Sequence, residues 1–235
     1  MRQSIRRIAI TSLALPAVFA AATPAFAQDE ESKPLDIEFT LAAVSDYRFR
    51  GISLSDKDPA FQPEISVTHE SGVYFTLWGS NIANNGGDDI EVDVSAGWAG
   101  KAGPLNLDVG AVYYAYPGAS GANYVELLGS VGTDVGKGNV ALNVGYAPSQ
   151  NHLGNQDNLY VAVAGEYPVG DTGLTLNGSF GIEDGAFADN KKDWSLGVDY
   201  DLAGFTVGVK YIDTAHTFGD PLGKGTAVVS ISRTF

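Results

Sequence analysis

The sequence predicts an all-β protein: a transmembrane antiparallel up-and-down β-barrel of about 12 strands. Polar and apolar residues alternate along almost the whole chain after its N-terminus, which is the period of a strand with one apolar face. Short and long connections alternate between these segments. Large aromatic residues gather at both ends of the apolar faces, and aliphatic residues lie between them. No helical periodicity and no linker interrupts this pattern.

The N-terminus has the three parts of a secretory signal peptide. Arg2, Arg6 and Arg7 precede an apolar stretch, residues 8–21, and the small residues "AFA" end at Ala27. The apolar stretch is shorter than the roughly 20 residues that a spanning helix needs. We therefore expect cleavage after Ala27, which divides the chain into a signal peptide at 1–27 and one barrel domain at 28–235.

Charge and composition exclude several classes of protein. The chain carries 14 basic and 28 acidic residues, a net charge of −14, and loss of the signal arginines leaves 11 and 28, a net charge of −17. Such an acidic protein is a poor partner for nucleic acid and attracts cations to its surface. The absence of cysteine excludes disulfides, thiol catalysis and cysteine zinc sites. No later segment is apolar enough for a membrane helix, so only a barrel of this chain would cross a bilayer.

Twelve segments show the alternation, and most have the length of a tilted membrane strand, about 9–11 residues. In the first, Leu35, Ile37 and Phe39 share one face while Asp36 and Glu38 share the other. Continued along the first segment, this parity places Tyr47 and Phe49 on the lipid face. The twelve are 35–51, 60–70, 73–80, 90–99, 105–116, 123–132, 139–148, 158–168, 174–183, 193–201, 205–213 and 225–235.

The connections predict which end of the barrel is which. "SG", "GKAGP", "TDVGKG", "VGDTG" and "DLAG" form a shorter set, while "ISLSDKDP", "IANNGGDD", "PGASGA", "SQNHLGNQD", "DGAFADNKK" and "TAHTFGDPLGKG" are mostly longer. Short periplasmic turns and longer outer loops are typical of outer-membrane barrels. An even number of strands returns both termini to the side of the short turns.

The aromatic residues predict two girdles around an aliphatic band, as in a barrel that sits in a bilayer. The expected outer girdle consists of Tyr47, Phe49, Phe61, Tyr113, Tyr146, Phe180, Trp194 and Tyr211. The expected inner girdle consists of Phe75, Trp98, Tyr167, Tyr200, Phe205 and Phe235. Leu41, Ile65, Val67, Val92, Val94, Leu107, Val109, Val161, Leu196, Val207 and Val229 lie between them. A soluble sandwich would instead bury its large aromatics in the middle of its strands.

The last segment ends on Phe235, and a terminal aromatic on such a strand resembles the signal that the outer-membrane assembly machinery recognises. Arg233 stands where an apolar or aromatic residue is usual. Because it lies near the interface, a lipid-facing arginine costs only about 0–1 kcal/mol there, and its stem can snorkel.

Several blocks of the chain resemble one family. "SDYRFRGISLSDKDPAFQP", "HESGVYFTLWGSNI", "DDIEVDVSAGWAG", "LDVGAVYYAYPG" and "NYVEL" are similar to the TorF-type porin family, formerly a conserved hypothetical outer-membrane family of Gram-negative bacteria. The resemblance covers most of the chain after the signal and is densest at 44–127. It implies an outer-membrane barrel that acts as a porin. Leu54 and "FTLWGS" depart from the family pattern without affecting the fold.

The face opposite the lipid collects the charged residues. Period two places Asp36, Glu38, Asp46, Glu64, Glu91, Asp93, Asp108, Glu126, Glu183, Asp193 and Asp199 in the lumen, together with Arg48, Arg50 and Lys210. Ionised groups inside a barrel need water or partners. The candidates for a constriction are Arg48, Arg50, Asp46, Glu64, Glu91, Asp93, Glu126 and Lys210. The two arginines either pair with acids of neighbouring strands and fix the register, or oppose acids across the constriction and orient polar solutes.

We therefore expect a porin-like channel, in the outer membrane of a Gram-negative bacterium, for passive diffusion of small polar solutes or ions. Twelve strands lie between barrels that side chains fill and barrels that leave a channel. The alternative is a structural or adhesive barrel with a plugged lumen, whose loops contact lipopolysaccharide. We expect no cofactor and no enzymatic activity.

Catalytic and metal sites are the weaker hypotheses. The three histidines, His69, His152 and His216, lie on the lipid face or in loops, away from any distinctive serine. "SDKD" and "NNGGDD" offer oxygen ligands but lack the spacing of an EF-hand, so solvated acidic loops are the favoured interpretation.

Overall fold

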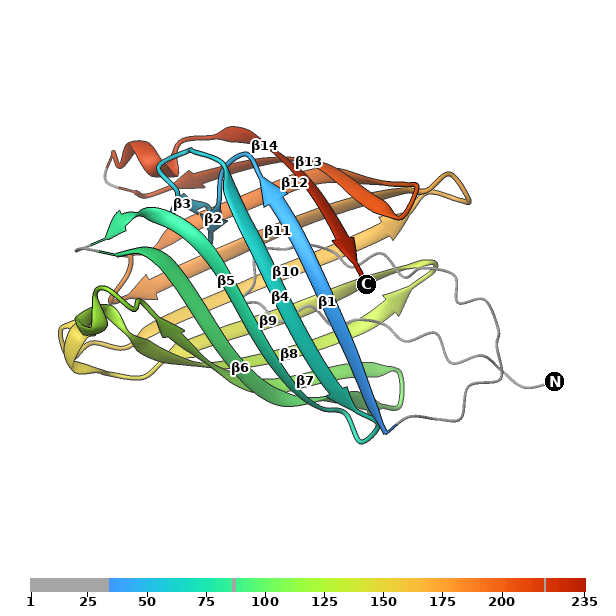
Figure 1. Cartoon of the computed structure of the whole chain (residues 1–235), viewed down its shortest axis with the longest axis horizontal. Coiled ribbons are helices and arrows are strands. Elements are labelled where there is room, and N and C mark those ends of the chain that lie inside the picture. The colour runs from blue at the N-terminus through green and yellow to red at the C-terminus, as the bar shows by residue number, and fades with distance from the viewer. Residues whose placement is uncertain (1–33, 86–87, 218) are drawn as a thin grey trace.

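In the computed structural model, twelve strands close into one barrel (Figure 1). The structure describes residues 34–85, 88–217 and 219–235, so the predicted signal peptide lies outside the described residues. The barrel strands are β1 (Leu35–Val44), β4 (Ala60–His69), β5 (Val73–Asn85), β6 (Asp88–Ala102), β7 (Leu105–Ala115), β8 (Tyr124–Val135), β9 (Gly138–Ala147), β10 (Asn158–Pro168), β11 (Leu174–Gly185), β12 (Lys191–Leu202), β13 (Phe205–Ala215) and β14 (Thr226–Thr234).

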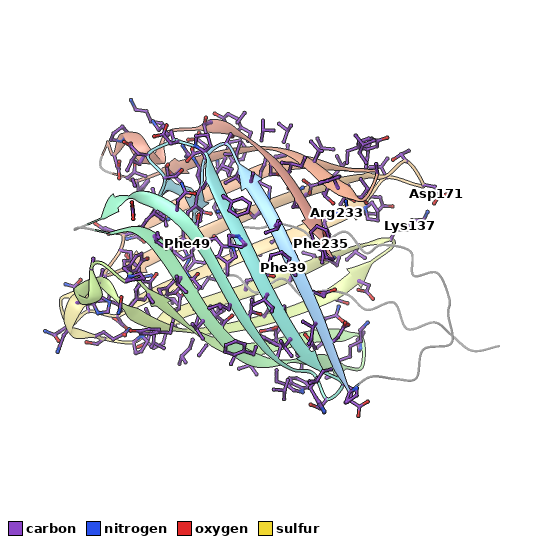
Figure 2. All side chains as sticks on the ribbon, viewed as in Figure 1. Phe39, Phe49, Lys137, Asp171, Arg233 and Phe235 are labelled. Carbon is purple, nitrogen blue, oxygen red and sulfur yellow. The ribbon has the colours of Figure 1, made fainter. Side chains whose placement is uncertain are left out.

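Every barrel strand pairs antiparallel with its neighbours, and β1 closes the ring against β14. At this seam Leu41 pairs with Arg233, and the Phe235 amide donates to the Phe39 carbonyl at 2.9 Å. Figure 2 shows Phe39, Arg233 and Phe235 close together there. A closed ring leaves no unpaired strand edge. The predicted fold class, an antiparallel barrel of twelve strands, is confirmed.

The remaining elements lie in the connections. β2 (Arg48–Phe49) and β3 (Ile52–Ser53) form a separate two-stranded sheet between β1 and β4. Three single-turn 3₁₀ helices, η1 (Ser120–Ala122), η2 (Asn151–Leu153) and η3 (Pro221–Gly223), lie in later connections. Within the described part of the chain, no helix is long and apolar enough to cross a membrane.

The outer surface of the barrel is apolar. Val109 is 60% exposed and Leu196 is 65% exposed, although both are aliphatic residues in strand interiors. The aromatics predicted for the girdles are also exposed, apart from Tyr47 and Phe49. Such a continuous apolar surface suits a bilayer and not water. The exposed girdle members are Phe61, Tyr113, Tyr146, Phe180, Trp194 and Tyr211 in the outer set, and Phe75, Trp98, Tyr167, Tyr200, Phe205 and Phe235 in the inner set.

Short and long connections lie at opposite ends of the barrel. The short ones, such as 103–104 and 203–204, form what we call the turn end, where Figure 2 shows Lys137 and Asp171. Ala203 and Gly204 both have positive φ, 53° and 82°, which is the geometry of a tight type I′ hairpin turn. The long connections form the loop end. The predicted loop 82–89 is mostly strand, since β5 reaches Asn85 and β6 begins at Asp88.

The first strand is shorter than predicted, which corrects the placement of Tyr47 and Phe49. β1 ends at Val44, and residues 45–59, which we call the inward loop, leave the wall. Tyr47 is fully buried and Phe49 is half-buried, so neither faces lipid. Arg50 and Gly51 have positive φ, 47° and 84°, and reverse the chain between β2 and β3. Because β2 is itself extended, the period-two pattern runs on through a hairpin that has left the wall.

Candidate functional site: a loop that crosses the lumen

The inward loop is a small hairpin with its own hydrogen bonds. The Leu54 amide donates to the Tyr47 carbonyl at 2.8 Å, and the Ser55 hydroxyl accepts from the Tyr47 amide at 2.9 Å. Asp46 accepts from the Ser53 hydroxyl through Oδ1 at 2.6 Å. These bonds satisfy backbone groups that lie inside the barrel, away from any wall strand. The hairpin therefore supplies hydrogen bonds of its own where it leaves the sheet.

Arg48 holds the hairpin together. Its Nε donates to Asp46 Oδ2 at 2.7 Å, while its Nη1 donates to the carbonyls of Gly51 at 2.9 Å and Lys224 at 3.0 Å. Lys224 belongs to the connection between β13 and β14, so the same guanidinium also ties the hairpin to that connection. The acidic partner of Arg48 lies within the loop, and not on a neighbouring strand.

Arg50 reaches acids on distant strands. Its Nη2 donates to both oxygens of Glu126 on β8 at 2.6 Å, and its Nη1 donates to Glu183 on β11 at 2.8 Å. Its guanidinium also lies 4.4 Å from the ring centroid of Tyr160. Burial alone would lower the pKa of Arg50, but the charges of Glu126 and then Glu183 raise it above its ordinary value. The guanidinium therefore stays charged in the lumen.

The tip of the loop touches the wall opposite its origin. Counted either way around the ring, β9 is the sixth strand from β1. A side chain at Gly145 of β9 would lie 2.6 Å from Arg50 Nη2, so glycine makes room for the guanidinium. A Cβ on Gly51 would lie 2.9 Å from Asp193 Cβ, which shows how closely the tip packs on β12. The inward loop thus spans the lumen, and we call strands β8, β9, β11 and β12 the far wall.

Lys191 completes the contact with the far wall. It pairs with Glu183 at 2.7 Å, lies 4.0 Å from Asp193, and donates to the Arg50 carbonyl. Arg50 and Lys191 together neutralise Glu126 and Glu183. Burying these charges is tolerable because each has a partner of opposite sign within hydrogen-bond distance.

Strands β4, β5 and β6, which we call the near wall, meet the loop with aromatic and acidic side chains. The Tyr47 ring packs edge-on against Trp78 at 5.4 Å, and the Ala83 amide of β5 donates to the Leu54 carbonyl at 2.7 Å. On β6, Glu91 and Asp93 are 1% and 2% exposed. Neither carboxylate forms an ion pair with a cationic side chain of the described residues.

Aromatic rings continue from the near wall toward the loop end. Tyr114 stacks on Tyr124 at 4.3 Å, and Tyr124 contacts Phe187 and His152. Tyr47, Trp78, Tyr114 and Tyr124 belong to one buried apolar cluster, against which Phe49 and Leu54 of the inward loop also pack.

Of the predicted constriction residues, the structure gathers six around the inward loop: Asp46, Arg48, Arg50, Glu91, Asp93 and Glu126. Glu64 and Lys210 lie on the partly buried faces of β4 and β13. Sequence reasoning missed Lys191, which was assigned to an outer loop. Extending the parity of Asp193 by two residues would have found it, because Lys191 begins β12 and shares that face.

Nothing in the described residues forms a cluster of three or more His, Cys, Asp or Glu side chains that could hold a metal ion. The structure describes the carboxylates of one of the two acidic loops considered as calcium sites, but only part of the other loop. Asp56 and Asp58 are exposed on the inward loop. In "NNGGDD", the side chains of Asn84, Asn85 and Asp88 lie outside the described set. His69 bonds to Ser71, and His216 lines an open cavity of about 390 Å³ with Ile52, Phe187 and Lys191 at the loop end.

Three solved structures share this architecture. The KdgM porin aligns with a TM-score of 0.57 and the NanC porin with 0.56, each at 10% identity over 85% of this chain and 98% of theirs. The third, a structure of the KdgM porin in complex with disordered oligogalacturonate, aligns with a TM-score of 0.57. At 10% identity the likeness shows the fold alone.

The sequence comparisons give the family. No curated protein matches the sequence. One family model, described as a bacterial protein of unknown function (Gcw_chp), matches residues 28–235. The TorF-type name suggested by the sequence blocks stays a prediction. Because the match covers nearly the whole chain, the protein belongs to the Gcw_chp family.

Proposed function

We propose that the protein is an outer-membrane channel through which small polar solutes or ions diffuse past a constriction made by the inward loop. The observation that carries the proposal is the loop's reach across the lumen, from β1 to Gly145 of β9, inside a closed barrel. Loops that narrow a pore set its size limit and field. The barrel likeness to two porins supports the same function.

The charge balance around the loop favours cations. Arg48, Arg50 and Lys191 are each paired with a carboxylate. Among the buried charged side chains of the described residues, seven carboxylates outnumber three cations, so the lumen lining is biased towards acid. An acidic lining concentrates cations and repels anions. A polyanion such as the oligogalacturonate of the KdgM complex would meet repulsion in this lumen.

The membrane setting follows from the outer surface. Two aromatic girdles and an apolar band suit a bilayer, with the loop end facing outward, where it would meet lipopolysaccharide. Phe235, 62% exposed at the end of β14, supports recognition by the outer-membrane assembly machinery. Its ring lies 4.8 Å from the Arg233 guanidinium, which accommodates that charge at the interface.

Single-channel recording tests the proposal. The folded protein, inserted in a planar bilayer under a KCl gradient, should conduct in small discrete steps and show a reversal potential on the cation-selective side. Replacing both Arg48 and Arg50 with alanine should move the reversal potential further in that direction. Absence of conductance from protein shown to be folded by its heat-dependent shift on an SDS gel would contradict the channel.

A plugged structural barrel is the second candidate, and the buried aromatic cluster favours it. Tyr47, Trp78, Tyr114 and Tyr124 fill the lumen beside the loop with apolar side chains. A structural barrel would not conduct, and it would not admit small polar solutes into liposomes. The liposome-swelling rate with a series of neutral sugars separates the two functions.

A further inference from the structure

The near wall holds an unusual set of oxygen atoms. Four side chains, each at most 2% exposed, carry buried oxygens that lack a hydrogen bond of ordinary geometry. They are the Tyr47 hydroxyl, Gln62 Oε1, Glu91 Oε2 and both carboxylate oxygens of Asp93. Buried polar groups without partners are rare because each costs free energy. A group of them on adjacent elements indicates something that is bound there.

Strand register brings these side chains to one place. In β5 and β6, Ser80 pairs with Glu91 and Trp78 pairs with Asp93. The Gln62 amide of β4 donates to the Ser80 hydroxyl at 3.3 Å, which directs Gln62 toward the same row. Directly paired residues on one face of a sheet have Cβ atoms only about 5 Å apart.

The inward loop closes this place from the lumen side. The Tyr47 ring packs on Trp78 at 5.4 Å, above the strand pair that carries Asp93. Burial raises the pKa of the Tyr47 hydroxyl, and the charges of Glu91 and Asp93 add to the effect, so the three groups are electrostatic neighbours. That hydroxyl interacts with the Glu91 carboxylate as a donor, although not within the geometry of an ordinary hydrogen bond.

The nearby cationic side chains are already engaged. Arg48 pairs with Asp46, Arg50 with Glu126 and Glu183, and Lys191 with Glu183. The described partners of Glu91 are neutral hydroxyls: Tyr116 donates to Oε1 at 3.0 Å, and the Tyr47 hydroxyl also interacts with the carboxylate. Two carboxylates therefore lie in a buried site where the described residues offer oxygen atoms and no compensating side-chain cation.

We propose that Glu91 and Asp93, with Tyr47 and Gln62 beside them, bind a calcium ion that fixes the inward loop to the near wall. Two carboxylates balance the charge of a divalent cation. Ca²⁺ accepts irregular sets of carboxylate, amide and water oxygens, whereas Mg²⁺ demands near-ideal octahedral geometry and gives up water reluctantly. The loop is then held on both sides, by the ion at the near wall and by Arg50 at the far wall.

Calcium titration of the folded full-length protein in detergent, after removal of bound metal with a chelator, tests the site. Calorimetry should detect one saturable Ca²⁺ per chain, and excess Mg²⁺ should compete poorly. Asp93→Asn should weaken the binding at least tenfold. Asp199→Asn, a matched change at a lumen carboxylate that accepts from Asn177, should leave it unchanged. If the wild-type protein shows no saturable Ca²⁺ binding, the proposal is overturned, whatever the variants do.

Terbium luminescence locates the ion. Tb³⁺ replaces Ca²⁺ and emits when a neighbouring tryptophan is excited, and Trp78 is the buried one, while Trp98 and Trp194 face outward. Trp78→Phe should remove most of the sensitised emission, whereas Trp194→Phe should retain it. Emission that survives Trp78→Phe, or equal Ca²⁺ affinity in Asp93→Asn, would place the ion elsewhere, such as the exposed acidic loops, and overturn this site.

Discussion

The inward loop contacts two walls of the barrel, and the buried carboxylates of these walls are compensated in opposite ways. At the far wall, Glu126 and Glu183 each lie within 2.8 Å of the Arg50 guanidinium, and Lys191 adds a second cation. At the near wall, Glu91 and Asp93 are as deeply buried but pair with no cationic side chain of the described residues. At the far wall the chain's own cations thus neutralise Glu126 and Glu183, whereas the near-wall carboxylates need a solute ion, water or protons. One loop can therefore be held to one wall by its own ion pairs, while its contact with the other wall leaves carboxylates that a ligand can bind.

Removal of the inward loop, which eliminates its contacts with both walls, should have the largest effect. Val44 pairs directly with Ala60, so a short Gly-Ser linker can replace residues 46–58 without stretching β1 or β4. Without the hairpin the lumen should approach the width of an unobstructed twelve-stranded barrel, and conductance should rise roughly several-fold. Planar-bilayer recording measures it. Conductance equal to that of the wild type would mean that the loop does not form the constriction.

The far wall should respond strongly to loss of Arg50. Arg50→Ala leaves Glu126 and part of Glu183 buried without their cation, a change that typically costs about 3–5 kcal/mol. Urea unfolding in detergent micelles, followed by tryptophan fluorescence, gives the difference. Lys192→Ala, an exposed neighbour of Lys191, is the control and should change little. Equal stability of the two variants would show that the Arg50 pairs contribute nothing.

A single methyl group on β9 should loosen the same contact less severely. In Gly145→Ala the new Cβ would lie 2.6 Å from Arg50 Nη2 and 2.9 Å from Glu126 Oε1, so the ion pair must shift. We expect about 1–3 kcal/mol of destabilisation, the usual range for overpacking. Gly129→Ala on β8 meets no atom within 4 Å and should be close to neutral. If the two alanines behave alike, the contact is not tightly packed.

The near wall should tolerate loss of charge. With calcium removed by a chelator, Asp93→Asn takes away a buried carboxylate that has no cationic partner within the described part of the chain, so stability should fall by less than about 1 kcal/mol or rise. Glu126→Gln, under the same conditions, should destabilise clearly because it leaves Arg50 with one partner fewer. Equal losses in the two variants, measured by urea unfolding, would remove the distinction between the walls.

The local alternation of polar and apolar residues predicts much of the architecture. The alternation along 105–116 predicts β7 and its two faces, because strand geometry fixes side-chain direction with a period of two. The aromatic and aliphatic positions predict the outer surface, where Val109 and Leu196 are exposed. The same rule placed Glu126 and Asp93 inside. It did not reach Lys191, because the strand β12 begins earlier than its apolar residues indicate.

The sequence predicts the twelve strands and the faces of most of their side chains, because strand periodicity depends on residues near in sequence. Closure of the ring depends on the pairing of β1 with β14, which lie at opposite ends of the described chain. Only the tertiary structure decided that β1 stops at Val44 and that the following hairpin crosses the lumen. Arg50 meets partners 76 and 133 residues away. Period two is the same in a wall strand and in a hairpin inside the barrel. The choice between them is made by contacts such as the space at Gly145, which exist only once the ring has closed.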